Sequence, residues 1–161
     1  LAALMFIRKV ADTTTVTRVT PEYIEAGRPH SLQENPLPEY VTVFRVHGPF
    51  LFGATEKLSA ILDHLQELPP YVILRLRNMT AIDATGLLAL EDLADRVHLT
   101  GRTLILCSAR TQPAQLMRQT EFERHVGHDN ICPHIEAAIN RAKILHDGSG
   151  AQQPAPHLAG Q

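Results

Sequence analysis

The sequence contains no tryptophan, and aromatic residues make up only 5% of its 161 residues. Ile, Leu and Val must therefore build the core, and they fill a protein interior at ordinary density. A strong charge of one sign is also missing, since 15 basic residues face 17 acidic ones. No basic stripe alternates with aromatic residues, so the sequence lacks the usual features of nucleic-acid binding, and we expect no nucleic-acid partner.

Cysteine is scarce as well. Cys107 lies in the apolar run TLILCSA, Cys132 precedes a proline, and neither belongs to a CxxC pair. Such isolated cysteines indicate reduced thiols of a cytosolic domain and exclude a disulfide framework.

The chain also lacks a long hydrophobic run. Residues 1–7 are wholly apolar and Arg8-Lys9 follow at once, but a membrane helix needs ~20 apolar residues. No charged region precedes them, as it would in a signal peptide. We interpret residues 1–9 as the cytoplasmic end of a transmembrane helix. The alternative is a short amphipathic or tag-derived start.

Hydrophobic periodicity divides the rest of the chain. Residues 10–38 contain four prolines and predict a linker, with one extended segment at 14–20. Residues 146–161 predict a disordered tail. Between them we expect strands at 40–48, 71–77 and 103–109, and helices at 54–68, 84–100, 112–127 and 131–145. This alternation predicts an α/β domain over residues 39–145, with helices packed on a small parallel sheet.

Three patterns resemble chemical sites without fulfilling their requirements. Residues 48–55 match a phosphate-binding loop, except that Ala54 replaces its lysine. Neither Ser59 nor Ser108 lies in a nucleophile elbow, and no pair of catalytic carboxylates is visible. The third pattern gathers five potential metal ligands within ten residues: His125, His128, Asp129, Cys132 and His134. Their spacing matches no known ligand set, so a surface loop is the preferred interpretation. We therefore expect no enzymatic activity, no metal and no cofactor.

The remaining motif, Asp83-Ala84-Thr85-Gly86, lies between an apolar strand and an apolar helix. Asp83 or Thr85 can cap the helix, and Gly86 permits close packing or an unusual dihedral angle. A phosphate on Thr85 could also be held by the amides and dipole of the helix N-terminus. The residues alone leave both interpretations open, a structural cap and a regulatory switch on a partner-binding corner.

Two segments carry a family resemblance. AIDATGLLALEDL and VFRVHGPFLFGATEKL resemble the STAS domains of SulP-family anion transporters, over residues 40 to 145. The resemblance implies an α/β fold with a small mixed, mainly parallel β-sheet and about four helices. It also implies a non-catalytic regulatory domain at the cytoplasmic face of the membrane, at the C-terminal end of a sulfate, bicarbonate or dicarboxylate transporter.

Partners and site residues follow from the same resemblance. The implied partner is the transporter's own transmembrane domain, along with a second copy of the domain, a cytoplasmic protein or a nucleotide. In free-standing anti-sigma-factor antagonists, which are the alternative class, the residue matching Thr85 is a phosphorylated serine. Here it is threonine, and Ala84 stands where those proteins often have serine. The short link before residue 71 lacks the insertion of animal transporters and indicates a bacterial origin.

Overall fold

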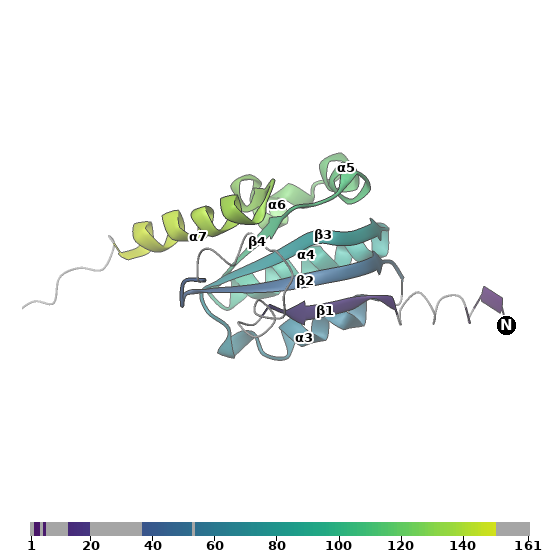
Figure 1. The fold of residues 1–161 in the computed structure, drawn as a ribbon, viewed down its shortest axis with the longest axis horizontal. Helices are drawn as coiled ribbons and strands as arrows, with labels where there is room; N and C mark the ends of the chain where they lie inside the picture. The colour runs from purple at the N-terminus through teal and green to yellow at the C-terminus, as the bar shows by residue number, and fades with distance from the viewer. Residues whose placement is uncertain (1, 4, 6–12, 20–36, 53, 151–161) are drawn as a thin grey trace, which may run out of the picture.

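A five-stranded sheet forms the centre of the protein (Figure 1). The computed structural model describes residues 2, 3, 5, 13–19, 37–52 and 54–150. The strands are β1 (Thr15–Arg18), β2 (Val41–Phe50), β3 (Tyr71–Ile82), β4 (Thr103–Cys107) and β5 (Ile131–Cys132), and they follow one another across the sheet in chain order. β1 runs antiparallel to β2, and the other neighbours are parallel. The prediction of a mixed, mainly parallel sheet is confirmed.

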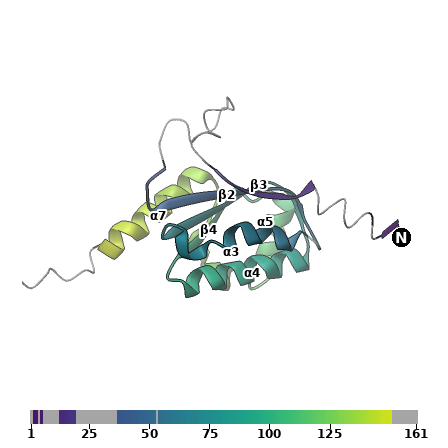
Figure 2. The ribbon, with the colours of Figure 1, turned by 90° about the horizontal axis from the view of Figure 1, so that it is seen from below.

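Helices cover the two faces of the sheet unequally (Figures 1 and 2). The helical segments are η1 (Thr55–Leu58), α3 (Ser59–Leu62), η2 (Leu65–Glu67), α4 (Ala84–Leu99), α5 (Thr111–Gln119), α6 (Phe122–Val126), η3 (His128–Asn130) and α7 (Ile135–Gly150). The segment from η1 to η2 packs with α4, α5 and α6 into one core. On the other face α7 packs alone over a smaller core.

Strand alternation explains the two cores, because successive side chains of a strand point to opposite faces. In β3, Val72, Leu74 and Leu76 belong to the larger core, which we call the α4 side. Tyr71 and Ile73 belong to the smaller one, the α7 side. Burial on both faces is why LILC in β4 and YVIL in β3 are continuous apolar runs.

Two predicted helices are divided. The helix expected at 54–68 is a series of η1, α3 and η2, because the backbone of His64 (φ −118°, ψ 14°) leaves the helical region. The helix expected at 112–127 breaks at Thr120, which is extended (φ −117°, ψ 173°). The apolar side chains of both segments still reach the core, so the hydrophobic period was informative although the helices are not continuous.

The ends of the domain also differ from the predicted boundaries. Strand β1 lies inside the expected linker, at the predicted extended segment, and it joins the sheet by pairing with β2. The helix expected at 131–145 starts only at Ile135, because residues 131–132 form β5. It then continues to Gly150, so residues 146–150 of the expected disordered tail are helical. The remainder of that tail and most of residues 1–9 lie outside the described residues. Among the residues that the structure does describe, no helix is long and apolar enough to span a membrane.

The chain reaches the sheet at the carboxyl ends of the parallel strands. Thr14 donates its hydroxyl to the carbonyl of Pro49. Gly48 has a φ of +92°, and a Cβ there would lie 2.7 Å from the carbonyl oxygen of Thr13. Glycine at 48 therefore gives both the left-handed backbone and the room for the chain just before β1.

Candidate functional site

Asp83 connects two loops at the carboxyl end of the sheet. It is the N-cap of α4, and its Oδ1 accepts a hydrogen bond from the Gly86 amide at 2.8 Å. Its Oδ2 accepts from the Phe52 amide at 3.1 Å, in the loop that follows β2. A single carboxylate therefore fixes the start of α4 and the β2–η1 loop relative to each other.

Gly86 allows α4 to approach the end of β2. A Cβ on Gly86 would lie 2.3 Å from the carbonyl oxygen of Phe50 and 2.9 Å from Cγ1 of Ile82. Such distances are shorter than any van der Waals contact, so only glycine fits without movement of the backbone. This position requires glycine because the end of β2 passes so close to it, and not because of an unusual dihedral angle.

The next residues of the motif are exposed. Ala84 and Thr85 lie in the first turn of α4 with their side chains in solvent. Within the described part of the chain, no hydrogen bond to the Thr85 hydroxyl is seen. Leu88, one turn on and 64% exposed, shares the helix face of Thr85, and Phe52 is 61% exposed beside Asp83. We call Phe52, Ala84, Thr85 and Leu88 the corner patch.

Gln112 completes the support of this corner and has no counterpart among the predicted site residues. Its Oε1 accepts from the Ile82 amide and its Nε2 donates to the Ile82 carbonyl, both at 2.9 Å. Strand β4 pairs with β3 only as far as Arg75, so this side chain of α5 continues the pairing at the far end of β3. The only signal in the sequence was a polar residue in the first turn of a helix.

The histidines of the suspected metal cluster are directed to different carboxylates. His125 Nδ1 lies 3.1 Å from Asp95 Oδ1, His128 Nδ1 lies 3.0 Å from Glu123 Oε2, and His134 Nδ1 lies 3.1 Å from Glu136 Oε2. The amide of Ala137 in the first turn of α7 donates to the same His134 Nδ1 at 3.1 Å, and in this hydrogen bond the nitrogen is an acceptor and does not donate to Glu136. Among the residues that the structure describes, no group of three or more His, Cys, Asp and Glu could hold a metal ion.

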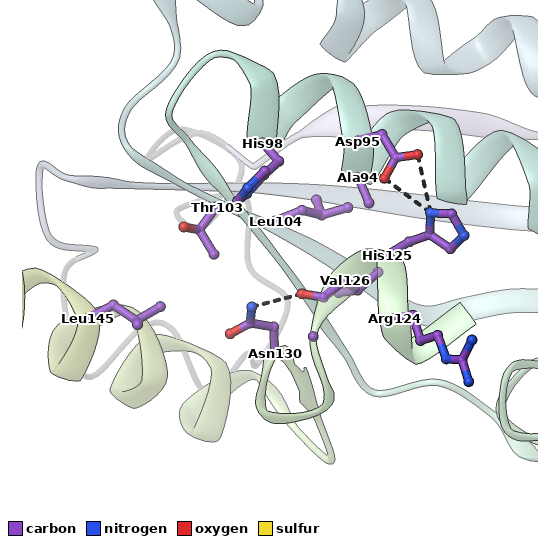
Figure 3. Close-up of a pocket in the computed structure, with 11 residues that line it drawn as sticks. Ala94, Asp95, His98, Thr103, Leu104, Arg124, His125, Val126, Asn130 and Leu145 are labelled. Atoms are coloured by element: carbon purple, nitrogen blue, oxygen red, sulfur yellow. Dashed lines mark hydrogen bonds and ion pairs between the residues drawn. The ribbon is translucent and has the colours of Figure 1, made fainter. Parts of the chain in front are cut away.

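A cavity of about 410 Å³ lies away from the corner patch, between α4, α6 and the end of α7 (Figure 3). Its polar side chains include Asp95 and His98 from α4, Arg124 and His125 from α6, and Asn130. The imidazole of His125 points to Asp95, and Thr103 supplies the one hydroxyl among the residues that line the cavity. In Figure 3 Thr103 and His125 lie at different parts of the cavity.

Comparison with known proteins identifies the fold that carries these features. The family model described as STAS domain matches residues 33–138. The chain belongs to the STAS domain family.

Relatives of this STAS domain come from sulfate transporters. A putative sulfate transporter, YvdB, from Bacillus subtilis (strain 168) is 24% identical over 135 residues, which are 83% of this chain and 24% of that protein. The STAS domain thus spans about a quarter of the length of this curated relative.

Two solved structures share both fold and sequence with it. A sulfate transporter family protein from Wolinella succinogenes superposes with a TM-score of 0.67 and 29% identity, over 75% of this chain and 99% of that one. The STAS domain of a SulP transporter from Vibrio cholerae superposes with a TM-score of 0.61 and 28% identity, over 72% of this chain and 92% of that one.

We expect the pair of His125 on α6 and Asp95 on α4 to stabilise this STAS domain by an amount that depends on pH. The hydrogen bond to Asp95, together with the nearby charge of Glu91, raises the pKa of His125. A raised pKa in the folded state stabilises the domain below the unfolded pKa of about 6.5, and this stabilisation is lost as the pH rises through the folded pKa. We expect His125→Gln to lower the melting temperature more at about pH 5.5 than at about pH 8.5.

The control for this pH dependence is Asp95→Asn, which removes the carboxylate that His125 is hydrogen-bonded to and should reduce the same pH-dependent difference. His128, whose pKa is raised by Glu123, is unchanged in all three proteins and cancels in the comparison. A melting-temperature difference between wild type and His125→Gln that is the same at both pH values would contradict the role of the pair.

Proposed function

We propose that this STAS domain is the cytoplasmic regulatory and interaction domain of a secondary anion transporter of the sulfate, bicarbonate or dicarboxylate class. The similarity to STAS domains of sulfate transporters supports this, as does the share of the YvdB length that the chain spans. On this proposal residues 1–9 are the end of the last transmembrane helix, and the domain lies at the cytoplasmic face of the membrane. It has no catalytic role. Its first partner is the transmembrane domain of its own chain.

The proposed site rests on a difference among residues 83–86, because two of them fix the backbone and Thr85 is exposed to solvent. Asp83 and Gly86 fix the backbone, with one carboxylate holding two loops and one glycine in contact with Phe50. Thr85 is exposed on that fixed backbone, as are the apolar side chains of Phe52 and Leu88. Exposed apolar groups on a rigid support are typical of protein interaction sites. The corner patch is therefore the proposed docking surface, whether for the transmembrane domain, a second copy or a cytoplasmic protein.

Phosphorylation of Thr85 would change this surface by electrostatics. A phosphate adds about −1.5 to −2 charge, and Asp83 already places a carboxylate at the same helix end. The Gly86 amide is occupied by Asp83, so the phosphate would gain little from the helix N-terminus there. Negative charge on Thr85 opposes burial of this corner patch against an apolar partner, so we expect modification to release the partner.

The test compares Thr85→Asp with Thr85→Val in the full-length transporter. Thr85→Asp adds the charge, whereas Thr85→Val keeps the side-chain shape without the hydroxyl. We expect Thr85→Asp to change sulfate uptake about ten-fold, corresponding to about 1.4 kcal/mol of docking free energy. Thr85→Val should stay close to wild type. Uptake is normalised to the amount of transporter at the membrane.

Melting temperatures of the two variant domains provide the control. If both substitutions lower stability equally and uptake follows stability, Thr85 is only part of a helix start and the docking site is wrong. If a transporter truncated after Arg8 takes up anions normally, the regulatory role itself is contradicted.

A further inference from the structure

The central sheet carries positive charge although the chain as a whole does not. None of the five described strands contains Asp or Glu, whereas they contain four arginines and a histidine: Arg18, Arg45, His47, Arg75 and Arg77. The whole chain has a net charge of −2. The acidic residues that the structure describes therefore lie outside the strands.

The strand register places most of these cations on one face. Arg45 pairs with Arg75, and Arg75 pairs with Cys107. Two residues earlier in each strand, Val43, Ile73 and Ile105 form a row that belongs to the smaller core under α7. Because residues two apart in a strand point to the same face, Arg45 and Arg75 also lie on the α7 side. Arg18 is on the opposite face, where its Nε donates to Thr42 Oγ1 at 3.0 Å.

A bulge adds Arg77 to this face. The pairing of β2 with β3 shifts register between Arg45 and His47. Leu76 and Met79 both belong to the core on the α4 side, so the two residues between them, Arg77 and Asn78, are on the α7 side. Two consecutive residues on one face are the mark of a β-bulge. Arg77 is exposed, and so is the neighbouring His47.

Helix α7 leaves this half of the sheet open. Its first buried residue, Ile135, packs near Cys107, and the helix then runs back to His146, which stacks on Tyr40 just before β2 begins. Beyond the row of Arg45 and Arg75 on the α7 side, His47 and Arg77 are exposed and Asn78 is half-buried. Thr15 and Thr17 of β1 are exposed there as well.

Arg75 keeps its charge beneath this open surface. It is only 5% exposed, and its Nε has no hydrogen-bond partner among the described residues. Burial raises the pKa of the adjacent Cys107 thiol to about 11, so the thiol is neutral and does not offset the guanidinium. Glu136 of α7 is the carboxylate that acts on Arg75, and its Oε2 also lies 3.1 Å from His134 Nδ1. We call Arg45, His47, Arg75, Arg77 and Asn78 the arginine face.

We propose that the arginine face binds the anionic headgroups of the membrane that carries the transporter. This inference rests on the proposed function, which places the domain at a membrane. The face lies in the middle of β2 and β3, and its His47 is next to Gly48, the position at which Thr13 brings the chain to the carboxyl end of the sheet. A membrane segment before Thr13 would hold this end nearest the bilayer. Positive charge on an open sheet surface whose described strands contain no Asp or Glu complements anionic lipid.

The test measures binding of this chain to vesicles of phosphatidylcholine alone and of phosphatidylcholine with phosphatidylglycerol. We expect binding to the anionic vesicles, weaker at about 1 M than at about 0.1 M salt, since the screening length falls about three-fold. Arg77→Gln should weaken the binding about five-fold, the effect of one basic residue at an anionic surface. The matched control is Arg96→Gln, which removes the same charge from an exposed position on α4, at the opposite side of the sheet.

The comparison of the two variants decides the outcome. All proteins keep the same apolar start, so any insertion of residues 1–7 into vesicles is common to them. Equal losses from Arg77→Gln and Arg96→Gln would overturn the proposal, as would equal binding to both kinds of vesicle. Competition by inorganic phosphate beyond that of sodium chloride at equal ionic strength would show a small-anion site and also overturn it. Binding is read without transport, so failure here leaves the regulatory role standing, and the reverse holds as well.

Discussion

Replacing Gly86 with alanine is expected to lower the free energy of unfolding by about 3 kcal/mol, at the upper end of the range for overpacking. The added Cβ would lie 2.3 Å from the Phe50 carbonyl oxygen, which belongs to the backbone of a central strand. A side-chain atom could move aside, but this atom can move only with β2. Helix α4 must then shift outward, and its buried leucines move with it. Chemical denaturation followed by circular dichroism measures the change.

Gly148→Ala is the matched control for Gly86→Ala. Gly148 is also helical, and a Cβ there would meet nothing within 4 Å. Alanine should stabilise the helix by about 0.5–1 kcal/mol, because glycine loses more conformational entropy on folding. If the two substitutions change stability in the same direction, the contact of α4 with the end of β2 is not as tight as described.

Asp83→Ala is the second substitution with a large expected effect, about 2 kcal/mol, at the top of the range for loss of an N-cap. The loss exceeds an ordinary cap because two amides, those of Gly86 and Phe52, lose their acceptor at once. Release of Phe52 should also loosen the β2–η1 loop. The melting temperature and the denaturation midpoint measure the loss, and faster hydrogen exchange of the Phe52 amide locates it.

Asp83→Asn separates the two hydrogen bonds. Asparagine remains a good N-cap for the Gly86 amide, but its NH₂ group cannot accept from Phe52. We expect a loss of about 1 kcal/mol, the usual net contribution of one hydrogen bond. If Asp83→Ala causes no loss in a melt, Asp83 does not stabilise the corner.

Local sequence patterns were sufficient to predict the strands and helices that form because their apolar side chains are buried. The sequence shows apolar runs in β3 and β4 because both faces of these strands pack against a core. It shows a three- and four-residue apolar spacing in α4 because one face of this helix packs against the core. The breaks at His64 and Thr120 are not visible, because the apolar spacing continues across them. Only the packing of the finished core decides that the chain turns there.

The corner was predictable in its residue types but not in its contacts. Asp83 before an apolar helix indicates a cap, and Gly86 indicates close packing or an unusual dihedral angle. That the second oxygen of Asp83 binds Phe52, and that Gln112 binds Ile82, depends on segments about 30 residues apart in the chain. Contacts at such a distance follow from the topology of the sheet, which hydrophobic periodicity does not encode. The arginine face is similar, since a bulge that adds Arg77 leaves no local signal.

The antiparallel pairing of β1 gives the domain a mechanical property. The chain enters at the carboxyl end of the sheet and β1 runs back along β2 through four residue pairs, from Thr15 with His47 to Arg18 with Phe44. Hydrogen bonds of an antiparallel ladder are perpendicular to the strands. Tension on the chain ahead of Thr15, directed along the strand, therefore loads these bonds together in shear instead of opening them one by one. A movement of whatever precedes β1 is thus passed to the central strand β2 as a rigid displacement, and with it to the loop that holds Phe52 and the corner patch.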